Sequence, residues 1–476
     1  MPQCLTQVCP PPTEPPTHSP TPASELLPLR NKVAYGIGDA APAMASISKS
    51  FFQLFFLTSV AGLSPIAAGT ILLRARVVDG ITDPLMGMLS DRTRSRFGRR
   101  RFWLLVGSVP FGVLFAAQWI TLPIDPNLRW WYFLAVITLF SLAFTLVHIP
   151  YTALTPELTR DYNERTSLNS YRFTFSILGS LTAGVSFPII VGQFATPQQG
   201  YMVAGLVFGV LTMFPMLVTF AGVRERHDPA HNAPPQPLPE LLRGVAGNRP
   251  YLYVVGIYLC SWMAIQITSA VLPFYITFWL QRPDLFSVMI FAIQGTALVF
   301  LFVWGWLSKR IGKKGVYLLG MLIWIGVQGA LFFVAPDQIG LAIGLAVLAG
   351  VGVATGYLMP WSMLPDVMEY DELQSGQRRE GVFYGLMIFV QKFGIALGIF
   401  LVGVFLETQG FNGDLLPGQQ PDSALFAIRA MVGPVPSLFL IGGILLTIGY
   451  PITRRKHAEI TAQLATRRTA SRLPLP

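Results

Sequence analysis

The sequence has few charged residues and few cysteines. Charged side chains make up 12% of its 476 residues, and it has three cysteines, of which Cys4 and Cys9 lie near the N-terminus. Cys260 lies far from both, so neither a disulfide scaffold nor a cysteine-rich metal site is indicated. The first thirty residues are rich in Pro, Thr and Ser and lack the apolar stretch of a secretory signal peptide. We expect a disordered cytoplasmic tail over residues 1–30.

Apolar residues take the place of the missing charge and form 52% of the chain. A single soluble core stops growing beyond about 250 to 300 residues, so a lipid bilayer is the natural solvent for this chain. About twelve apolar runs approach the roughly 20 residues that a membrane-spanning helix needs. They are continuous and do not alternate with period two, which favours helices over a barrel. We predict an all-α membrane protein with twelve transmembrane helices near 33–60, 64–90, 102–123, 130–156, 169–193, 201–222, 250–279, 285–308, 315–335, 339–364, 381–406 and 425–450.

The net charge of +10 is concentrated in alternate loops. By the positive-inside rule this pattern places both termini and the central loop in the cytoplasm, with the chain in a plasma or inner membrane. The cations are not spread over a face or interleaved with exposed aromatics, so nucleic acid is not an expected partner. The basic groups are Arg92, Arg94, Arg96, Arg99, Arg100 and Arg101; Arg224, Arg226, Arg243 and Arg249; Lys309, Arg310, Lys313 and Lys314; and Arg454, Arg455 and Lys456.

Three short motifs recur in the same order in the two halves of the chain. "GMLSDR" at 87–92 matches "GWLSKR" at 305–310, "IPYTALTPEL" at 149–158 matches "MPWSMLPDV" at 359–367, and "RFTFSILG" at 172–179 matches "KFGIALG" at 392–398. The near-constant offset indicates two parallel six-helix repeats, a transporter architecture with its substrate site between the halves. The predicted parts are an N-terminal bundle at 31–222, a central cytoplasmic loop at 223–249, a C-terminal bundle at 250–452 and a cytoplasmic tail at 453–476.

Two carboxylates interrupt the second apolar run. In "DGITDPLMGMLSDRTRSRFGRRR", residues 79–101, Asp79 and Asp83 are four residues apart and so project from one face of a helix. Leaving either one ionised against lipid costs several kcal/mol, so both must face a cavity or a partner. Thr82 and Thr145 could add neutral oxygens to make the hard-oxygen site that alkali cations prefer, with protonation as the substitute. The alternative is a structural ion pair with Arg76, one turn away.

The stretch at 79–101, together with "HIPYTAL" at 148–154, resembles the glycoside-pentoside-hexuronide:cation symporter branch of the major facilitator superfamily. Members of that branch include the melibiose permease, and vertebrate lysophospholipid transporters are similar to it. The resemblance spans all twelve predicted helices. It implies the major facilitator fold, cation-coupled transport, and a sodium site at Asp79, Asp83, Thr82 and Thr145. It does not imply a particular substrate.

Four more polar residues lie inside predicted spans: Lys49, His148, Arg172 and Lys392. Buried cations in membrane helices mark pathways, and the repeat places Arg172 and Lys392 symmetrically across the central cavity, where the resemblance also implies cavity cations. Their alternative role is to neutralise Asp79 and Asp83. His148 precedes Pro150, which can free a backbone carbonyl for ligand contact. The alternative for His148 is a packed core residue.

The sequence departs from the melibiose-type pattern at the sugar-binding positions. The resemblance matches the family's two sugar-binding carboxylates to Ala43 and His148, and a pocket tryptophan to Thr152, so a galactoside substrate is not implied. The cations Arg76, Lys49, Arg172 and Lys392 outnumber the two aspartates. We therefore predict a substrate with negative charge, such as a uronide, a sulfonated sugar or a phosphate-bearing amphiphile.

Acidic residues follow the fourth and tenth runs, in "PELTRDYNER" at 156–165 and "PDVMEYDE" at 365–372. They could pair with the basic loops when the cytoplasmic side closes. Single exposed pairs contribute only about 0 to 1 kcal/mol, but a network could bias two conformations. The alternative is a permanently solvated rim. The predicted gate residues are Asp91, Arg92, Arg99, Glu157, Asp161, Asp366 and Glu369.

These observations predict a monomeric secondary transporter that couples Na+ or H+ to a small-molecule substrate, a sugar or glycoside, by alternating access and without a cofactor. The alternative substrate is a lysophospholipid-type amphiphile. A channel would need charged rings or a filter motif, and neither is visible in the sequence. A membrane enzyme would need a nucleophile, a base and an orienting group inside the spans, and His148 is the only histidine there.

Overall fold

The computed structural model describes residues 27–159, 162–225, 247–375 and 380–470. The described residues form helices and loops without strands, which confirms the predicted all-α fold. The first half contains α1 (Leu29–Ile37), α2 (Ala40–Ser48), η1 (Lys49–Gln53), η2 (Phe56–Val60), α3 (Pro65–Arg92), α4 (Arg101–Ala117), α5 (Pro126–Ala153), α6 (Thr155–Leu158), α7 (Tyr162–Val191) and α8 (Pro197–Gly222).

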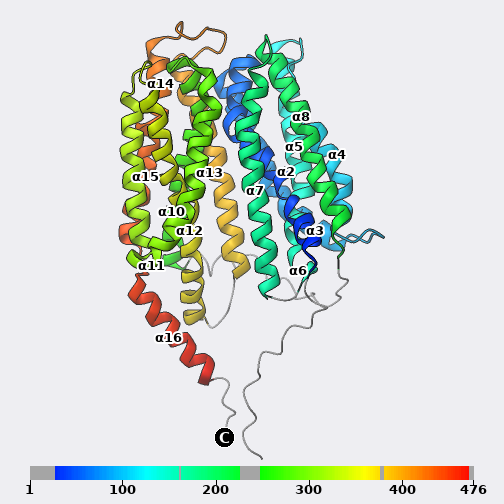
Figure 1. Ribbon diagram of the computed structural model, residues 1–476, viewed down its shortest axis with the longest axis vertical. Coiled ribbons are helices and arrows are strands. Elements are labelled where there is room, and N and C mark those ends of the chain that lie inside the picture. The colour runs from blue at the N-terminus through cyan, green and yellow to red at the C-terminus, as the bar shows by residue number, and fades with distance from the viewer. Residues whose placement is uncertain (1–26, 160–161, 226–246, 376–379, 471–476) are drawn as a thin grey trace, which may run out of the picture.

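The second half repeats this pattern of long helices, and Figure 1 shows the two halves standing side by side. It contains α10 (Arg249–Phe274), η3 (Tyr275–Trp279), η4 (Pro283–Leu285), α11 (Phe286–Phe333), α12 (Ile339–Ser375), α13 (Glu380–Thr408), α14 (Asp422–Val432), α15 (Pro434–Gly449) and α16 (Arg454–Ala470). Helix α16 extends beyond the bundle, so the predicted tail at 453–476 is largely helical. We call the end of the bundle from which α16 projects the tail end, and the other the opposite end.

Each of the twelve predicted apolar runs lies on helix, but the number of separate spans differs from the prediction. Eight helical segments are long and apolar enough to cross a membrane. One of them, α11, contains two predicted runs joined at Gly312, whose positive φ of 78° lets the chain turn there. Three predicted runs fall outside these eight segments. The run at 33–60 is divided among α1, α2, η1 and η2. The run at 64–90 lies on α3, which carries several charges, and the run at 102–123 lies on α4, which has only 17 residues. The count of twelve spans stays a prediction.

Helix starts follow local capping chemistry. The side chains of Ser64, Asp125, Thr196 and Asn248 each accept a hydrogen bond from a backbone N–H in the first turn of α3, α5, α8 and α10. In each case a proline occupies one of the first two helical positions, where its missing N–H costs nothing. The loop-to-helix boundaries are therefore encoded locally.

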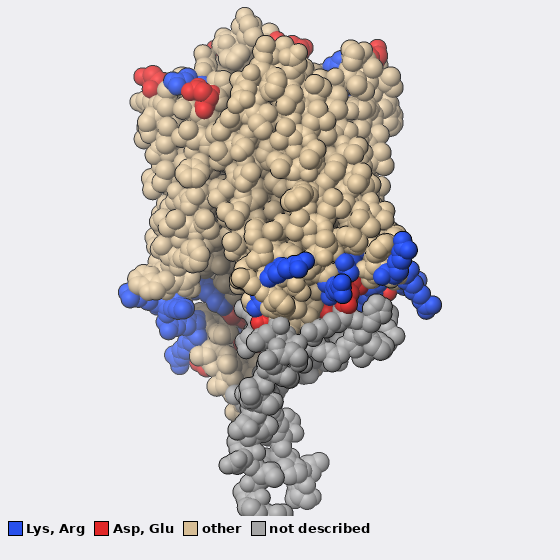
Figure 2. All heavy atoms as spheres, turned by 45° about the vertical axis from the view of Figure 1, so that its right-hand side comes forward, with Lys and Arg blue, Asp and Glu red and all other residues tan. Residues whose placement is uncertain are grey.

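On the face that Figure 2 shows, an apolar belt covers the middle of the bundle, and the charged side chains lie at its two ends. Large apolar side chains are exposed on this belt, including Phe302 at 76% and Phe333 at 77%. Lys and Arg side chains gather around the tail end. A water-soluble protein would not expose this much apolar surface, so the bundle lies in a bilayer.

The two halves are joined along α3 and α13 and along α7 and α11. Near the opposite end, a Cβ added at Gly403 of α13 would lie 2.3 Å from the carbonyl oxygen of Pro65, so these backbones meet closely. There the Glu407 carboxylate accepts the N–H of Ile66 at 2.6 Å, and Ser287 donates to the carbonyl of Val185 at 2.9 Å. These contacts hold the halves together at that end.

Candidate functional site

Helix α3 carries both predicted carboxylates at the interface between the halves. Asp79 is buried, with 2% of its surface exposed. Its Oδ2 lies 3.3 Å from Nη1 of Arg76, which is the ion pair anticipated as an alternative to cation binding. Its Oδ1 is also buried and has no hydrogen-bond partner among the described residues. A buried carboxylate oxygen without a partner is costly, so this oxygen is available to a further ligand.

Asp83 connects three helices. Thr145 of α5 donates a hydrogen bond to its Oδ1 at 2.9 Å, and the Lys392 ammonium of α13 contacts its Oδ2. The structure therefore brings Asp83, Thr145 and Lys392 together, and cation binding at this position stays a prediction. Because Lys392 belongs to the second half, this ion pair bridges the two halves.

The backbone between the two carboxylates is altered by Pro84. Proline has no N–H, so the carbonyl of Gly80 lacks its usual partner within α3. That carbonyl is a neutral oxygen without its helical donor, at a position between Asp79 and Asp83 in the chain. Thr82 donates instead to the carbonyl of Val78 at 3.0 Å and leaves its lone pairs free to accept.

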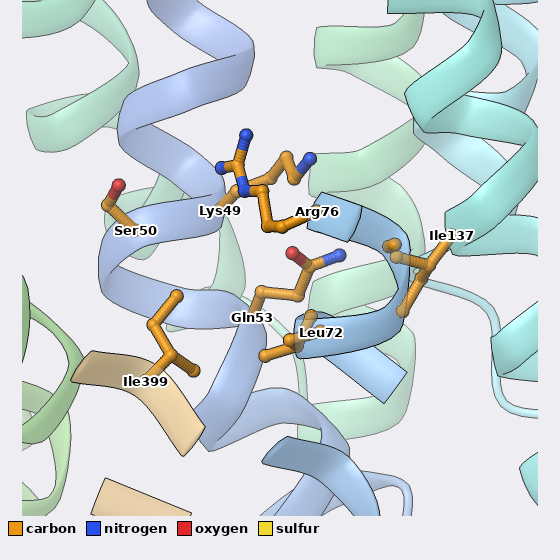
Figure 3. Close-up of a pocket in the computed structure, with 8 residues that line it drawn as sticks. Lys49, Ser50, Gln53, Leu72, Arg76, Ile137 and Ile399 are labelled. Atoms are coloured by element: carbon orange, nitrogen blue, oxygen red, sulfur yellow. The ribbon is translucent and has the colours of Figure 1, made fainter. Parts of the chain in front are cut away.

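Lys49 lies at the start of η1, on the same side of the first half as Arg76. Both residues line a small pocket, in which Figure 3 shows their side chains close to Gln53. The Lys49 ammonium lies 4.7 Å from the centre of the Phe140 ring. Lys49 is buried, with 7% of its surface exposed.

The structure gives Arg172 a different partner from the one expected. Its Nε lies 3.7 Å from Oδ2 of Asp39, so Arg172 neutralises that carboxylate and not Asp79 or Asp83. Asp39 lies in the short break between α1 and α2, where the regular helix is interrupted. Our reading of the sequence missed Asp39, although the signal used for Asp79, an acid within an apolar run, was present in "YGIGDAAPA".

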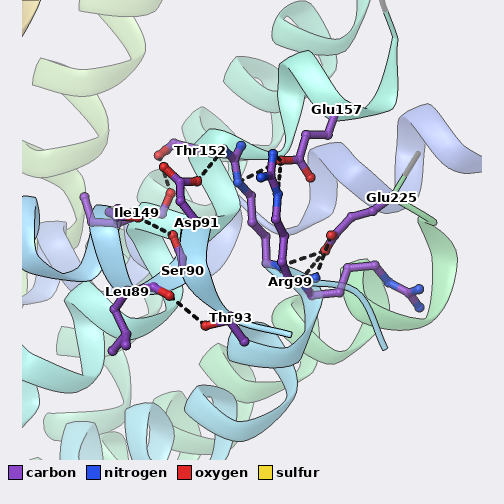
Figure 4. A network of polar contacts seen from close by, with 12 residues as sticks. Leu89, Ser90, Asp91, Thr93, Arg99, Ile149, Thr152, Glu157 and Glu225 are labelled. Carbon is purple, nitrogen blue, oxygen red and sulfur yellow. Dashed lines mark hydrogen bonds and ion pairs between the residues drawn. The ribbon is translucent and has the colours of Figure 1, made fainter. Parts of the chain in front are cut away.

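The three positions matched to the family's sugar site are not brought together by any described contact. Ala43 is buried on α2. The His148 ring packs on Phe144 with centroids 5.1 Å apart, and its Nδ1 is buried without a hydrogen-bond partner among the described residues. Thr152 lies at the tail end of α5, where its hydroxyl donates to the carbonyl of Ile149 at 3.0 Å (Figure 4).

Three of the predicted gate residues of the first half, Asp91, Arg99 and Glu157, form one cluster with Arg100 at the tail end (Figure 4). Glu157 accepts hydrogen bonds from Arg99 and lies 3.0 Å from Arg100, which also reaches Asp91 at 3.0 Å. Burial raises the pKa of the Glu157 carboxyl above its ordinary value, against the lowering by Arg99 and Arg100. Arg92 is exposed at the end of α3. Asp161 lies outside the described residues.

Glu225, which the sequence reading did not single out, fixes the start of α4. Its carboxylate accepts the backbone N–H groups of Arg99, Arg100 and Arg101 at 2.8, 2.9 and 2.5 Å. A carboxylate at a helix N-terminus interacts favourably with the helix dipole. The contact ties the end of α8 to the basic loop.

The gate residues of the second half form a separate cluster. Lys313 contacts both oxygens of Asp366 at 2.7 and 2.9 Å. His457 of α16 lies 2.8 Å from Glu369. The described pairs of both clusters stay within one half, so they do not bridge the halves as a closed gate would.

The described residues contain no group of three or more His, Cys, Asp or Glu side chains placed to hold a metal ion. Asp79 and Asp83 with the oxygens of Thr145 and Gly80 instead suit a weakly held monovalent cation. Such a cation would compete with Lys392 for Asp83. The arrangement can therefore exchange an internal positive charge for an external one.

Comparison with known proteins identifies the family and the fold of the chain. The family model for MFS/sugar transport proteins matches residues 34–454. An uncharacterized symporter of Synechocystis sp. is 39% identical, covering 94% of this chain and 98% of that protein. The sodium-dependent lysophosphatidylcholine symporter 1-A of Danio rerio is 28% identical, over 91% and 88%. A crystal structure of a bacterial homolog of the human lysosomal transporter Spinster has a TM-score of 0.64 at 13% identity, over 91% and 97%. The chain belongs to the MFS/sugar transport protein family and is a membrane transporter of the major facilitator superfamily.

Proposed function

We propose that this transporter is a symporter that couples a monovalent cation, Na+ or H+, to the uptake of an anionic sugar or glycoside. The observation that carries the proposal is the buried, unpartnered Oδ1 of Asp79, one helical turn from Asp83. A proton or an alkali cation satisfies that oxygen, and the hydroxyl of Thr145 and the carbonyl of Gly80 supply further hard ligands.

Coupling follows from competition at Asp83. Without a cation, Lys392 neutralises Asp83 across the two halves. A cation bound to Asp79 and Asp83 repels the ammonium and releases it toward the central cavity. Lys392 can then contact an anionic substrate, and the halves rock about the midplane. Because the coupling is reciprocal, substrate tightens cation binding as much as cation tightens substrate binding.

The charge balance supports an anionic substrate. Lys49, Arg76, Arg172 and Lys392 face three carboxylates, Asp39, Asp79 and Asp83, in the described interior. The family description favours a sugar. The second candidate is an amphiphile with an anionic or zwitterionic headgroup, because the similar Danio rerio protein is named a lysophosphatidylcholine symporter.

We further propose that the tail end faces the cytoplasm of a plasma or inner membrane. The support is the group of Lys and Arg side chains that Figure 2 shows at that end. The transport route lies between two halves of one chain, so a monomer is sufficient.

The test is Asp83→Asn in proteoliposomes with an inward sodium or proton gradient. Asn cannot hold a cation electrostatically, so gradient-driven accumulation should be lost. Counterflow without a gradient should persist, since it needs only alternating access. Normal accumulation by Asp83→Asn would refute the cation assignment. Non-saturable flux would indicate a channel, and chemical change of the solute would indicate an enzyme.

A further inference from the structure

A small pocket, mainly in the first half, is lined by two basic side chains, of which only Arg76 has a carboxylate partner among the described residues. Lys49, Ser50 and Gln53 contribute from the first membrane segment, and Arg76 contributes from α3. In Figure 3 the Lys49 and Arg76 side chains lie beside each other above Gln53. The remaining lining is apolar and comes from Leu72, Ala75, Ile137 and Ile399.

Lys49 is a buried basic residue that has no acidic partner among the described residues. Arg76 pairs with Asp79, Arg172 with Asp39, and Lys392 with Asp83. Among the residues that the structure describes, no carboxylate lies within ion-pair distance of the Lys49 ammonium. Asp79, Asp39 and Asp83 each pair with another basic side chain, which leaves Lys49 without a carboxylate partner among the described residues.

The protein surroundings of Lys49 do not compensate its burial. Its ammonium lies over the Phe140 ring, and a cation–π contact recovers only part of the cost of dehydrating an ammonium. Gln53 directs its amide nitrogen toward Gln118 at 2.7 Å and is already engaged. Lys49 also begins the π-helical turn η1, and such turns are frequent at functional sites.

We infer that this pocket binds the anionic group of the transported solute, a carboxylate, sulfonate or phosphate, with Lys49 as its counter-charge. Arg76 supplies a second cationic donor, and the Ser50 hydroxyl supplies a neutral one. The inference rests on the proposed function, because it concerns the solute of that same transport cycle. It adds the residue that selects for negative charge.

The pocket is also placed to report on the arrangement of the halves. Ile399 belongs to α13 in the second half, whereas the other lining residues belong to the first half. Movement of α13 relative to α3 therefore changes the size of the pocket. An anion seated beside Lys49 would favour one arrangement of the halves over the other.

The test compares pairs of solutes that differ in charge, using thermal unfolding of the purified full-length protein at constant sodium and ionic strength. The pairs are methyl β-D-glucuronide with methyl β-D-glucoside, 2,3-dihydroxypropane-1-sulfonate with glycerol, and lysophosphatidic acid with monoacylglycerol. At least one acid should stabilise the wild-type protein more than its neutral partner does. Lys49→Gln should bind that acid about tenfold or more weakly, because a charge-assisted contact is lost.

Two further variants separate charge recognition from damage to the fold. Lys49→Arg keeps the charge and should retain most of the acid binding. Lys309→Gln removes an exposed cation of α11 and should change nothing. The inference is overturned if no acid in the panel stabilises the wild-type protein, if Lys49→Gln binds the acid as tightly, or if it loses the neutral partner equally.

Sodium alone distinguishes this inference from the proposed function. Lys49→Gln should keep the stabilisation by sodium, since Asp79, Asp83 and Thr145 are unchanged, whereas Asp83→Asn should lose it. If neither sodium nor protons affect the wild-type protein while acid binding depends on Lys49, the coupling proposal fails and the pocket stands. If sodium stabilises the protein but acids do no better than their neutral partners, the pocket inference and the proposed negative charge of the substrate fail, while the cation-coupling proposal stands.

Discussion

Replacing Lys392 by Met should make the protein depend more strongly on sodium. The substitution keeps the length of the side chain but removes the charge that neutralises Asp83 across the halves. Breaking a fully buried pair costs about 3 to 5 kcal/mol, whereas an exposed pair contributes about 0 to 1 kcal/mol. The Lys392 and Asp83 side chains are 21% and 18% exposed. We therefore expect the free energy of unfolding of the Lys392→Met variant to be about 2 kcal/mol lower than that of the wild-type protein in sodium-free buffer.

The same change should tighten sodium binding. In the wild-type protein a cation must displace Lys392 before it reaches Asp83, and about 2 kcal/mol corresponds to roughly 30-fold in an equilibrium constant. The sodium concentration that gives half of the maximal stabilisation should fall by about 10- to 30-fold. The assay is tryptophan-fluorescence thermal unfolding in detergent, with choline chloride replacing sodium chloride at constant ionic strength.

Two controls make the result interpretable. Lys309→Met, at an exposed position, should behave like the wild-type protein. Asp83→Asn combined with Lys392→Met should recover stability without sodium, because removing both partners leaves no unpaired charge. If Lys392→Met needed as much sodium as the wild-type protein, or more, Lys392 would not compete with the cation and the exchange mechanism would be wrong.

Two further predictions concern the two ends of the bundle. Glu407→Ala removes the acceptor of the Ile66 N–H, so amide exchange at the start of α3 should quicken by about fivefold, corresponding to about 1 kcal/mol, as measured by mass spectrometry. Unchanged exchange there would show that the contact does not hold the halves. Burial raises the pKa of the Glu157 carboxyl, so folding favours its protonated form. The stability that this group contributes is therefore fully present below the pKa of the unfolded chain, near 4.5, and is lost as the pH rises through the folded pKa. The Glu157→Gln side chain cannot ionise, so this variant should lose less stability than the wild-type protein as the pH rises from 4.5 to 7. Parallel thermal melts measure this difference. An equal change of melting temperature with pH in the two proteins would contradict this account.

Asp79 and Asp39 show which residues of the site could be predicted from the sequence and which could not. Both are acids within apolar runs, and the cost of a lipid-exposed carboxylate requires each to face the interior. The spacing of Asp79 and Asp83 and the threonine at 145 pointed to one site, and the structure brings Asp83, Thr145 and Lys392 together. Asp39 has no second acid nearby in sequence, and only the fold places Arg172 beside it.

The sequence by itself determined the class of the molecule. Its long apolar runs, alternate basic loops and repeated motifs predict a helical membrane transporter, because membrane insertion and helix formation depend on local composition. The tertiary structure decided which charges meet. Arg172 was equally able to pair with Asp39, Asp79 or Asp83 until the packing of α7 against α2 fixed its position. Ion pairing depends on the distance between helices that are far apart in the chain, so only the structure shows that Lys49 lacks a carboxylate partner among the described residues, whereas Arg76, Arg172 and Lys392 each have one.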